Sequence, residues 1–126
     1  MTALIVFAHG SSVESANEAV RGVSAALAKQ GDYCLVATAF LEGGKPDLAG
    51  AVDEAARAGA TRVVVLPYFL TLGLHLQRDL PRLVNSLRNS HPGMEVEVAP
   101  PLDGHPALVD ILHERARAAT DAAPKK

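Results

Sequence analysis

Short apolar runs alternate with longer segments of helical periodicity, and this alternation constrains the fold more than any other feature. Strands are expected at residues 4–8, 34–40, 62–66 and 95–99. The run at 62–66 holds three consecutive valines, whose β-branched side chains favour an extended backbone. The run at 4–8 is apolar throughout, as expected of a strand buried on both faces of a sheet.

The first helix is expected to start at Ser11 and to run to about residue 29. Ser11 and Glu14 have the spacing of a capping box, in which Ser11 is the N-cap. Gly31 is expected to end this helix as its C′ residue, because glycine adopts the left-handed conformation that this position favours.

Three further helices follow the remaining strands. Pro46 is expected to open the second helix at a tolerated first-turn position, and Gly59 to close it. The third is predicted over residues 75–90, although Pro81 in its early turns favours a later start. The fourth is expected from Pro106 to about residue 118.

This order of elements predicts one α/β domain built on a four-stranded parallel sheet. Consecutive β-α units imply right-handed crossovers, with helices on both faces of the sheet. The polar and apolar alternation at 95–99 indicates an edge strand. The domain is expected to span residues 1–120, with a frayed tail at 121–126.

Composition excludes several classes of protein. The net charge of -2 comes without a basic patch, so nucleic-acid binding is not expected. The apolar runs are too short to cross a membrane, and the N-terminus reads directly into a strand rather than a signal peptide. The single cysteine, Cys34, excludes an intrachain disulfide and is expected to act as an inert small hydrophobe, which suits a cytoplasmic protein.

Candidate functional residues follow the strands, because open α/β sheets bind ligands at the carboxyl ends of their strands. The segments that follow the four strands contain three of the five histidines together with one glutamate, namely His9, His75, His105 and Glu42.

His9 and His75 are the candidate metal ligands. Gly10 lets the backbone turn directly after His9 and leaves the imidazole open to a ligand. The alternative is a histidine that caps the sheet by bonding to nearby backbone. A neutral His75 has a lone pair for a metal, and Asp79 one turn later is placed to accept its other ring proton. From spacing alone, metal binding by His75 and a solvated helix face are equally favoured.

The other candidates are weaker from the residues alone. Glu42 is placed to act as a third ligand or as a proton acceptor, but an ordinary exposed loop glutamate is favoured. A local structural role is favoured for His105 over contact with a substrate. His91 and His113 are interpreted as surface residues. The dinucleotide, P-loop, nucleophile-elbow and HExxH motifs are all absent.

Five segments together resemble a known family, the class II tetrapyrrole chelatases, and in particular the short form of the sirohydrochlorin chelatases. They are Ala8-His9-Gly10-Ser11, Ala39-Phe40-Leu41-Glu42, Leu66-Pro67-Tyr68-Phe69-Leu70 with Gly73 and His75, Asp79-Leu80-Pro81, and Ala99-Pro100-Pro101-Leu102 with His105-Pro106. The similarity extends over residues 4–118.

The resemblance implies a chelatase-like (flavodoxin-like) fold that inserts Co²⁺, Fe²⁺ or Ni²⁺ into sirohydrochlorin, in cobalamin, siroheme or related tetrapyrrole biosynthesis. The divalent metal is then a substrate, and no tightly bound cofactor is implied. Carried onto this chain, the metal-binding histidines are His9 and His75, which also assist proton removal, and Glu42 matches an acidic position. Short members pair as homodimers, so the subunit interface completes the pocket.

Substrate contacts are expected from Ser11, Leu72, Leu74, Arg78 and His105. Leu70, Leu72 and Leu74 are interpreted as an apolar wall for the macrocycle or part of a dimer interface; packing onto their own domain is the alternative. The carboxylates of sirohydrochlorin require cationic contacts, for which Arg78, Arg82 and Lys45 are placed.

Two other classes of function are weighed against the chelatase. A non-catalytic divalent-metal carrier would need the histidines but no wall for a macrocycle. A histidine phosphatase-like enzyme also has His-Gly after its first strand. It requires an arginine before the histidine to hold phosphate, and Ala8 occupies that position here.

Overall fold

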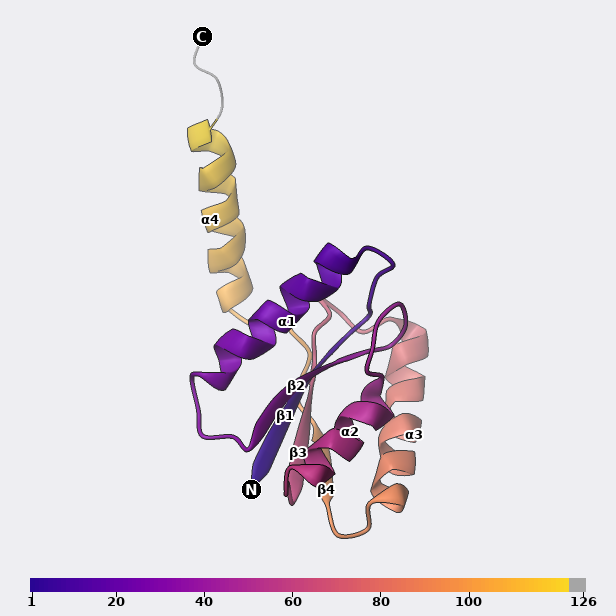
Figure 1. Ribbon diagram of the computed structural model, residues 1–126. Helices are drawn as coiled ribbons and strands as arrows, with labels where there is room; N and C mark the ends of the chain where they lie inside the picture. Colours follow the sequence, from indigo (N-terminus) through magenta and orange to yellow (C-terminus); the bar gives the residue numbers. More distant parts are fainter. Residues whose placement is uncertain (123–126) are drawn as a thin grey trace.

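A computed structural model describes residues 1–122 of the chain and shows four strands alternating with four helices (Figure 1). The elements are β1 (Thr2–Ala8), α1 (Glu14–Ala28), β2 (Leu35–Phe40), α2 (Leu48–Arg57), β3 (Arg62–Pro67), α3 (Leu74–Ser90), β4 (Glu95–Val98) and α4 (Ala107–Ala122). Each strand lies within two residues of its predicted bounds.

The strands form a single parallel sheet in the order β2-β1-β3-β4. Central strand β1 is buried from Ala3 to Ala8, because it has a neighbouring strand on each side and helices over its faces. β4 lies at one edge, where Val96 is buried and the residues beside it are exposed. The predicted α/β class, parallel sheet and edge strand are therefore confirmed.

Helices cover the two faces of the sheet unequally (Figure 1). α2 and α3 lie on one face, where their apolar residues join those of the strands in the main core. That core includes Ile5, Phe7, Val63, Val65, Leu48, Val52, Leu80 and Val84. α1 lies on the other face, since the Ser24 hydroxyl on α1 is 2.7 Å from the Thr38 hydroxyl on β2.

The predicted capping box at the start of α1 is wrong. The helix begins at Glu14, and its N-cap is Val13, which provides no side-chain hydrogen bond. The Ser11 hydroxyl instead accepts a hydrogen bond from the Val13 N–H at 3.0 Å, which shapes a turn before the helix. The helix ends at Ala28, within one residue of the predicted end, but the role given to Gly31 is wrong, because Gly31 does not adopt a left-handed conformation.

The start of α2 also differs from the prediction. Asp47 is its N-cap, and the Asp47 carboxylate accepts a hydrogen bond from the Gly50 N–H at 2.8 Å. An aspartate that satisfies a free N–H of the first turn defines the helix start more strongly than a preceding proline. Pro46 therefore lies just outside the helix, whereas Gly59, with φ of 88°, follows its end as predicted.

α3 has nearly the predicted bounds, and Pro81 lies inside it without delaying its start. Proline removes one N–H from the helix, so only the carbonyl of Gln77 loses its usual partner. Leu80 and Val84 on either side of Pro81 are buried in the core. Their packing favours a continuous helix across the proline.

α4 differs most from expectation, because it leads away from the rest of the molecule (Figure 1). It continues to Ala122, four residues beyond the predicted end, so Asp121 and Ala122 are helical. The remainder of the expected tail, residues 123–126, lies outside the described residues. Across residues 1–122, no helix has the length and apolar character required to cross a lipid bilayer.

Replacing Ile5 by alanine tests the importance of the central strand. The Ile5 side chain is fully buried between β1 and the α2–α3 layer, so Ile5→Ala is expected to lower the free energy of unfolding by about 2–5 kcal/mol. Urea denaturation followed by circular dichroism measures this change. Val13→Ala, at an exposed position, is the control, and an equal loss in both variants would contradict this description of the core.

Candidate metal-binding site

The carboxyl edge of the sheet brings together the loops that follow β1, β2 and β3. The Leu41 N–H donates to the Ala8 carbonyl at 2.9 Å, and the Tyr68 N–H donates to the Phe7 carbonyl at 2.8 Å. Three loops therefore begin side by side. The first carries His9, the second carries Glu42, and the third leads to His75, the second residue of α3.

His9 and Glu42 lie close together at this edge. His9 Nε2 and Glu42 Oε1 are 3.5 Å apart, and the two side chains are 61% and 71% exposed. His9 Nδ1 is 3.1 Å from the Gly10 carbonyl, which only accepts hydrogen bonds. A hydrogen bond there places the ring proton on Nδ1 and leaves the Nε2 lone pair facing Glu42.

The spacing of these two atoms suits a shared cation. Two ligand atoms that bind one transition-metal ion at about 2.1 Å in a tetrahedral arrangement stand roughly 3.4 Å apart. The imidazole nitrogen and the carboxylate oxygen lie at nearly that separation. Both face solvent, so a hydrated ion can reach them and leave again.

Gly10 is required by the contact between the first two loops. Its φ is 89°, and a Cβ atom at this position would lie 1.6 Å from the Glu42 carbonyl oxygen. The Glu42 N–H also donates to the His9 carbonyl at 2.9 Å. The turn predicted at Gly10 is confirmed, and the structure adds that only glycine allows the two backbones to approach so closely.

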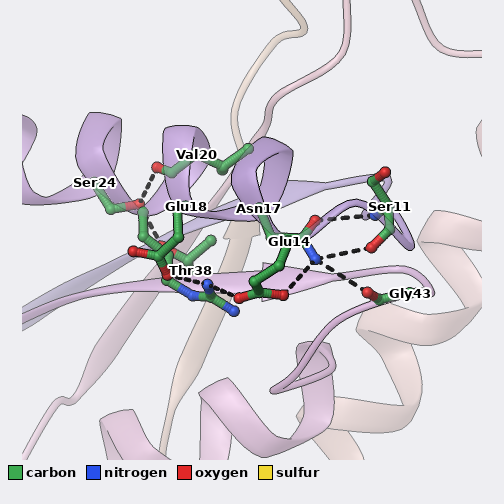
Figure 2. Close-up of polar contacts among 9 residues, drawn as sticks. Ser11, Glu14, Asn17, Glu18, Val20, Ser24, Thr38 and Gly43 are labelled. Atoms are coloured by element: carbon green, nitrogen blue, oxygen red, sulfur yellow. Dashed lines mark hydrogen bonds and ion pairs between the residues drawn. The ribbon is translucent and has the colours of Figure 1, made fainter.

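Asn17 on α1 joins the same two loops (Figure 2). Its side-chain oxygen accepts from the Ser11 N–H at 2.9 Å, and its amide nitrogen donates to the carbonyls of Ser11 at 2.9 Å and Gly43 at 3.0 Å. The residue is only 1% exposed. A buried amide with this many partners holds the loop of His9 against the loop of Glu42.

Sequence reasoning missed Asn17, although the sequence contained a signal. Asn17 and Ser24 are seven residues apart and are the buried residues of α1, so both lie on its inward side. Polar residues on the inward side of a helix require buried partners. The predicted capping box had placed Glu14 beside Ser11. The Glu14 carboxylate instead accepts a hydrogen bond from Arg21, which lowers the pKa of the Glu14 carboxyl.

His75 lies at the same edge of the sheet but makes no hydrogen bond or ion pair with His9 or Glu42. Its side chain is exposed in the first turn of α3, and the described residues show no hydrogen bond between His75 and Asp79. Within residues 1–122, no group of three or more histidine, cysteine, aspartate or glutamate side chains is arranged to hold a metal ion. A two-ligand pair is therefore the preformed part of the site.

The three leucines interpreted as one apolar wall lie in three different surroundings. Leu70 borders a hollow with Tyr68, Leu102 and the start of α4. Leu72 lines a groove of about 390 Å³ between α3 and β4. Leu74 is exposed in the first turn of α3. The single subunit therefore has no continuous apolar wall made from these three residues.

Other histidines take structural roles. His105 Nδ1 accepts from the Ala107 N–H at 3.0 Å at the start of α4, in line with the local role favoured for it. His91 is not simply a surface residue, because its Nε2 lies 3.0 Å from the Asp53 carboxylate and links the end of α3 to α2. His113 is exposed on α4, as predicted.

The remaining candidates have few contacts in the single chain. Arg78 and Arg82 are exposed on α3, and Lys45 is exposed in the loop before α2. Ser11 is tied by its backbone to Asn17 and by its hydroxyl to Val13, which makes it part of the loop scaffold. Cys34 is half-buried against the core, as expected of a small hydrophobe.

Curated relatives are similar to most of this chain. A sirohydrochlorin cobaltochelatase from Priestia megaterium is 34% identical over 115 residues, covering 91% of this chain and 37% of the relative. A sirohydrochlorin cobaltochelatase from Methanopyrus kandleri is 32% identical over 84 residues, covering 67% of this chain and 59% of the relative. The chain thus spans only part of the length of these relatives.

Solved structures share the fold. The CbiX protein from Marinobacter aquaeolei VT8, described as a putative cobalamin biosynthesis protein, superimposes with a TM-score of 0.85 at 25% identity and covers 98% of this chain and all of that one. The sirohydrochlorin chelatase SirB from Bacillus subtilis subspecies spizizenii, solved with cobalt, has a TM-score of 0.85 at 20% identity. It covers 93% of this chain and 50% of its own.

The family follows from a match over nearly the whole chain. The CbiX family model matches residues 3–119, a stretch that contains every strand, His9, Glu42 and His75. This match confirms the family predicted from the five sequence segments. The chain belongs to the CbiX family.

Proposed function

We propose that this protein inserts a divalent metal ion into sirohydrochlorin. The observation that carries the proposal is the exposed pair of His9 and Glu42, 3.5 Å apart at the carboxyl edge of the sheet. Support also comes from relatives named sirohydrochlorin cobaltochelatase, and from a sirohydrochlorin ferrochelatase of Arabidopsis thaliana that is 29% identical over 112 residues. The reaction serves cobalamin, siroheme or a related tetrapyrrole pathway.

The names of the relatives favour cobalt and iron as metal substrates. Solved SirB structures with cobalt and with Fe³⁺ share the fold of this chain. Nickel is included through the family resemblance. Imidazole and carboxylate bind Fe²⁺, Co²⁺ and Ni²⁺ in order of increasing affinity, so the cellular supply of metal decides among them.

Metal binding begins at the preformed pair. A hydrated ion approaches the exposed edge, and the Nε2 lone pair of His9 and a Glu42 oxygen replace two of its water molecules. His75 supplies a second imidazole from the first turn of α3. Two nitrogen ligands and one oxygen hold such an ion without the closed cage that a set of thiolates would form, so the ion can pass to the macrocycle.

Insertion also requires proton transfer, because two pyrrole N–H groups lose their protons as the four ring nitrogens bind the ion. The Glu42 carboxylate accepts one proton at Oε1 or Oε2 when the metal leaves it. An imidazole freed from the metal accepts the other at its ring nitrogen. His9 and Glu42 thus act first as metal ligands and then as bases.

A single subunit gives the macrocycle too little enclosure. The hollow beside Leu70 and the groove beside Leu72 share no lining residue, and the His9–Glu42 pair is exposed. A second copy would provide the opposite wall, so we include a homodimer in the proposal. We place the protein in the cytoplasm, because a free, half-buried thiol such as that of Cys34 suits a reducing compartment.

The alternative is a carrier that binds metal and delivers it without chemistry. An exposed two-ligand site with no wall for a macrocycle is the observation that favours it. The two functions differ in one measurable respect. A carrier leaves the rate of insertion into sirohydrochlorin unchanged, whereas a chelatase raises it.

Alanine replacements of His9 and His75 test the proposed site. Each removes an imidazole ligand, so His9→Ala and His75→Ala are expected to lower the insertion rate at least tenfold. The rate is followed by the absorbance change on anaerobic mixing with sirohydrochlorin and Co²⁺, Fe²⁺ or Ni²⁺. His113→Ala, on the exposed helix α4, is the matched control and should retain full activity.

Two outcomes would count against the assignment. If the unmodified protein accelerates insertion with none of the three metals, the chelatase function is excluded. The carrier function then stands if equilibrium dialysis shows that the protein binds metal. Full activity in both histidine variants would show that the metal binds elsewhere.

Asn17 is expected to affect activity through the position of the two loops. Asn17→Ala leaves the Ser11 N–H and the Ser11 and Gly43 carbonyls without partners, at a cost of about 1–3 kcal/mol in unfolding free energy. The insertion rate should also fall about tenfold or more under conditions in which the variant is fully folded.

Ser24→Ala is the control for Asn17, because Ser24 is also a buried polar residue of α1 but bonds to Thr38, away from the site. It should lose stability and keep its activity per folded molecule. Equal activity in the Asn17 and Ser24 variants would mean that Asn17 has only a structural role.

A further inference from the structure

Arg21 lies on the inward side of α1, between Asn17 and Ser24, where an arginine is unusual. Residues 17, 21 and 24 are three or four positions apart, so they share one side of the helix. The Arg21 side chain is 34% exposed, about half as much as the two carboxylates that it binds. A guanidinium turned towards its own domain requires partners there, and Arg21 has three.

The first partner of Arg21 is the ring of Phe40 at the end of β2. The guanidinium carbon lies 5.3 Å from the ring centroid, and Phe40 is fully buried. Phe40 faces α1, because side chains alternate along a strand and Thr38, two residues earlier, contacts Ser24 of that helix. A cation over an aromatic face is attracted by its π electrons. Arg21 therefore holds the ring two residues before Glu42.

The loop that carries Glu42 packs against this ring. A Cβ atom at Gly44 would lie 2.9 Å from the Phe40 ring and 3.1 Å from the Asn17 amide nitrogen, so the loop backbone lies close to both groups. The Phe40 N–H also donates to the Pro46 carbonyl at 2.9 Å, which folds the loop back over the end of the strand. The position of the ring thus influences the position of Glu42.

The second partner is Glu14, which connects Arg21 to the same loop by another route. Arg21 Nη1 donates to Glu14 Oε1 at 2.6 Å. The Asn17 amide nitrogen donates to Glu14 Oε2 at 3.4 Å and to the Gly43 carbonyl at 3.0 Å (Figure 2). The bonds from Arg21 and Asn17 lower the pKa of the Glu14 carboxyl, so it remains charged at neutral pH. A continuous set of contacts therefore runs from Arg21 to the residue after Glu42.

The third partner, Glu18, provides a matched comparison. Arg21 Nη1 also donates to Glu18 Oε1, three residues earlier on the same helix. Glu18 is exposed, and within residues 1–122 its side chain makes no hydrogen bond to the loops of the site. An ion pair of this kind on a helix surface contributes little to stability. Glu14 and Glu18 thus bind the same guanidinium, but only Glu14 links it to the site.

We propose that Arg21 is a positioning residue of the metal site, which places Glu42 for its bond to the metal. It acts through its contacts with Phe40 and Glu14. The Glu42 side chain is 71% exposed, so its loop has to hold it at the right distance from His9. A displacement of about 1 Å is enough to disturb such a site. The inference rests on the proposed function, since it assumes that Glu42 binds the metal substrate.

The first test measures the affinity for Co²⁺ alone by equilibrium dialysis, without sirohydrochlorin. Arg21→Gln removes the charge that binds Glu14 and Phe40, and it is expected to raise the Kd about tenfold, as the loss of a residue that orients a metal ligand does. The visible absorption spectrum of the bound Co²⁺ should change as well, because it depends on the arrangement of the ligands.

Three further variants separate the contacts of Arg21. Glu18→Ala removes only the pair within the helix and should leave the Kd for Co²⁺ unchanged. Glu14→Ala removes one of the two routes to the loop, so its Kd should lie between those of the unmodified protein and Arg21→Gln. Arg21→Lys keeps the positive charge and should bind Co²⁺ more tightly than Arg21→Gln.

The second test asks whether Arg21 acts through Glu42. Glu42→Ala removes the carboxylate and should itself weaken Co²⁺ binding. If Arg21 acts by placing that carboxylate, Arg21→Gln added to Glu42→Ala should raise the Kd by less than about twofold more, whereas independent effects would multiply. Urea denaturation followed by circular dichroism gives the folded fraction of each variant, for which the affinities are corrected.

The outcomes separate this inference from the proposed activity. An unchanged Kd in Arg21→Gln, an equal rise in Glu18→Ala, or effects of Arg21→Gln and Glu42→Ala that multiply would overturn the inference. A loss of affinity fully explained by unfolding would do the same. If the unmodified protein binds Co²⁺ but does not accelerate insertion into sirohydrochlorin, only the proposed activity is rejected. A protein that binds no Co²⁺ would overturn the metal site and this inference together.

Discussion

The contact between the loops that follow β1 and β2 is the constraint on which the candidate site depends. Parallel pairing brings the two strand ends together, and Gly10 lets the backbones approach to a distance that no side chain would permit. The buried amide of Asn17 then bonds to both loops. Because these interactions involve backbone and a buried side chain, His9 and Glu42 can be exposed and still be held close together.

This arrangement separates the rigid part of the site from its open part. The scaffold of Gly10 and Asn17 is buried or half-buried, whereas the two side chains proposed to bind metal face solvent. A metal substrate has to arrive and depart, so a closed set of ligands would hold it too strongly. The enclosure that a macrocycle requires must come from elsewhere, and a second copy is the source that we propose.

Much of the fold could be predicted from the sequence, because apolar periodicity reports directly on burial. The run at 62–66 and the continuous apolar run at 4–8 identified the central strands, and helical periodicity identified α3 despite Pro81. The ends of helices were less predictable. Ser11 and Glu14 had the spacing of a capping box, but Asn17 binds the Ser11 backbone and the helix starts at Glu14. Local capping patterns cannot anticipate a competing partner brought in by the fold.

The sequence by itself determined the order of strands and helices, the edge at which the candidate functional residues gather and, through five segments that include His9, Glu42 and His75, the family. Those properties follow from periodicity and from motifs, which are local. Only the tertiary structure decided that His9 faces Glu42 across the Gly10 contact, that Asn17 holds both loops, and that α4 leaves its own domain. Each of these depends on the distance between residues far apart in the chain, which packing sets and a linear pattern does not contain.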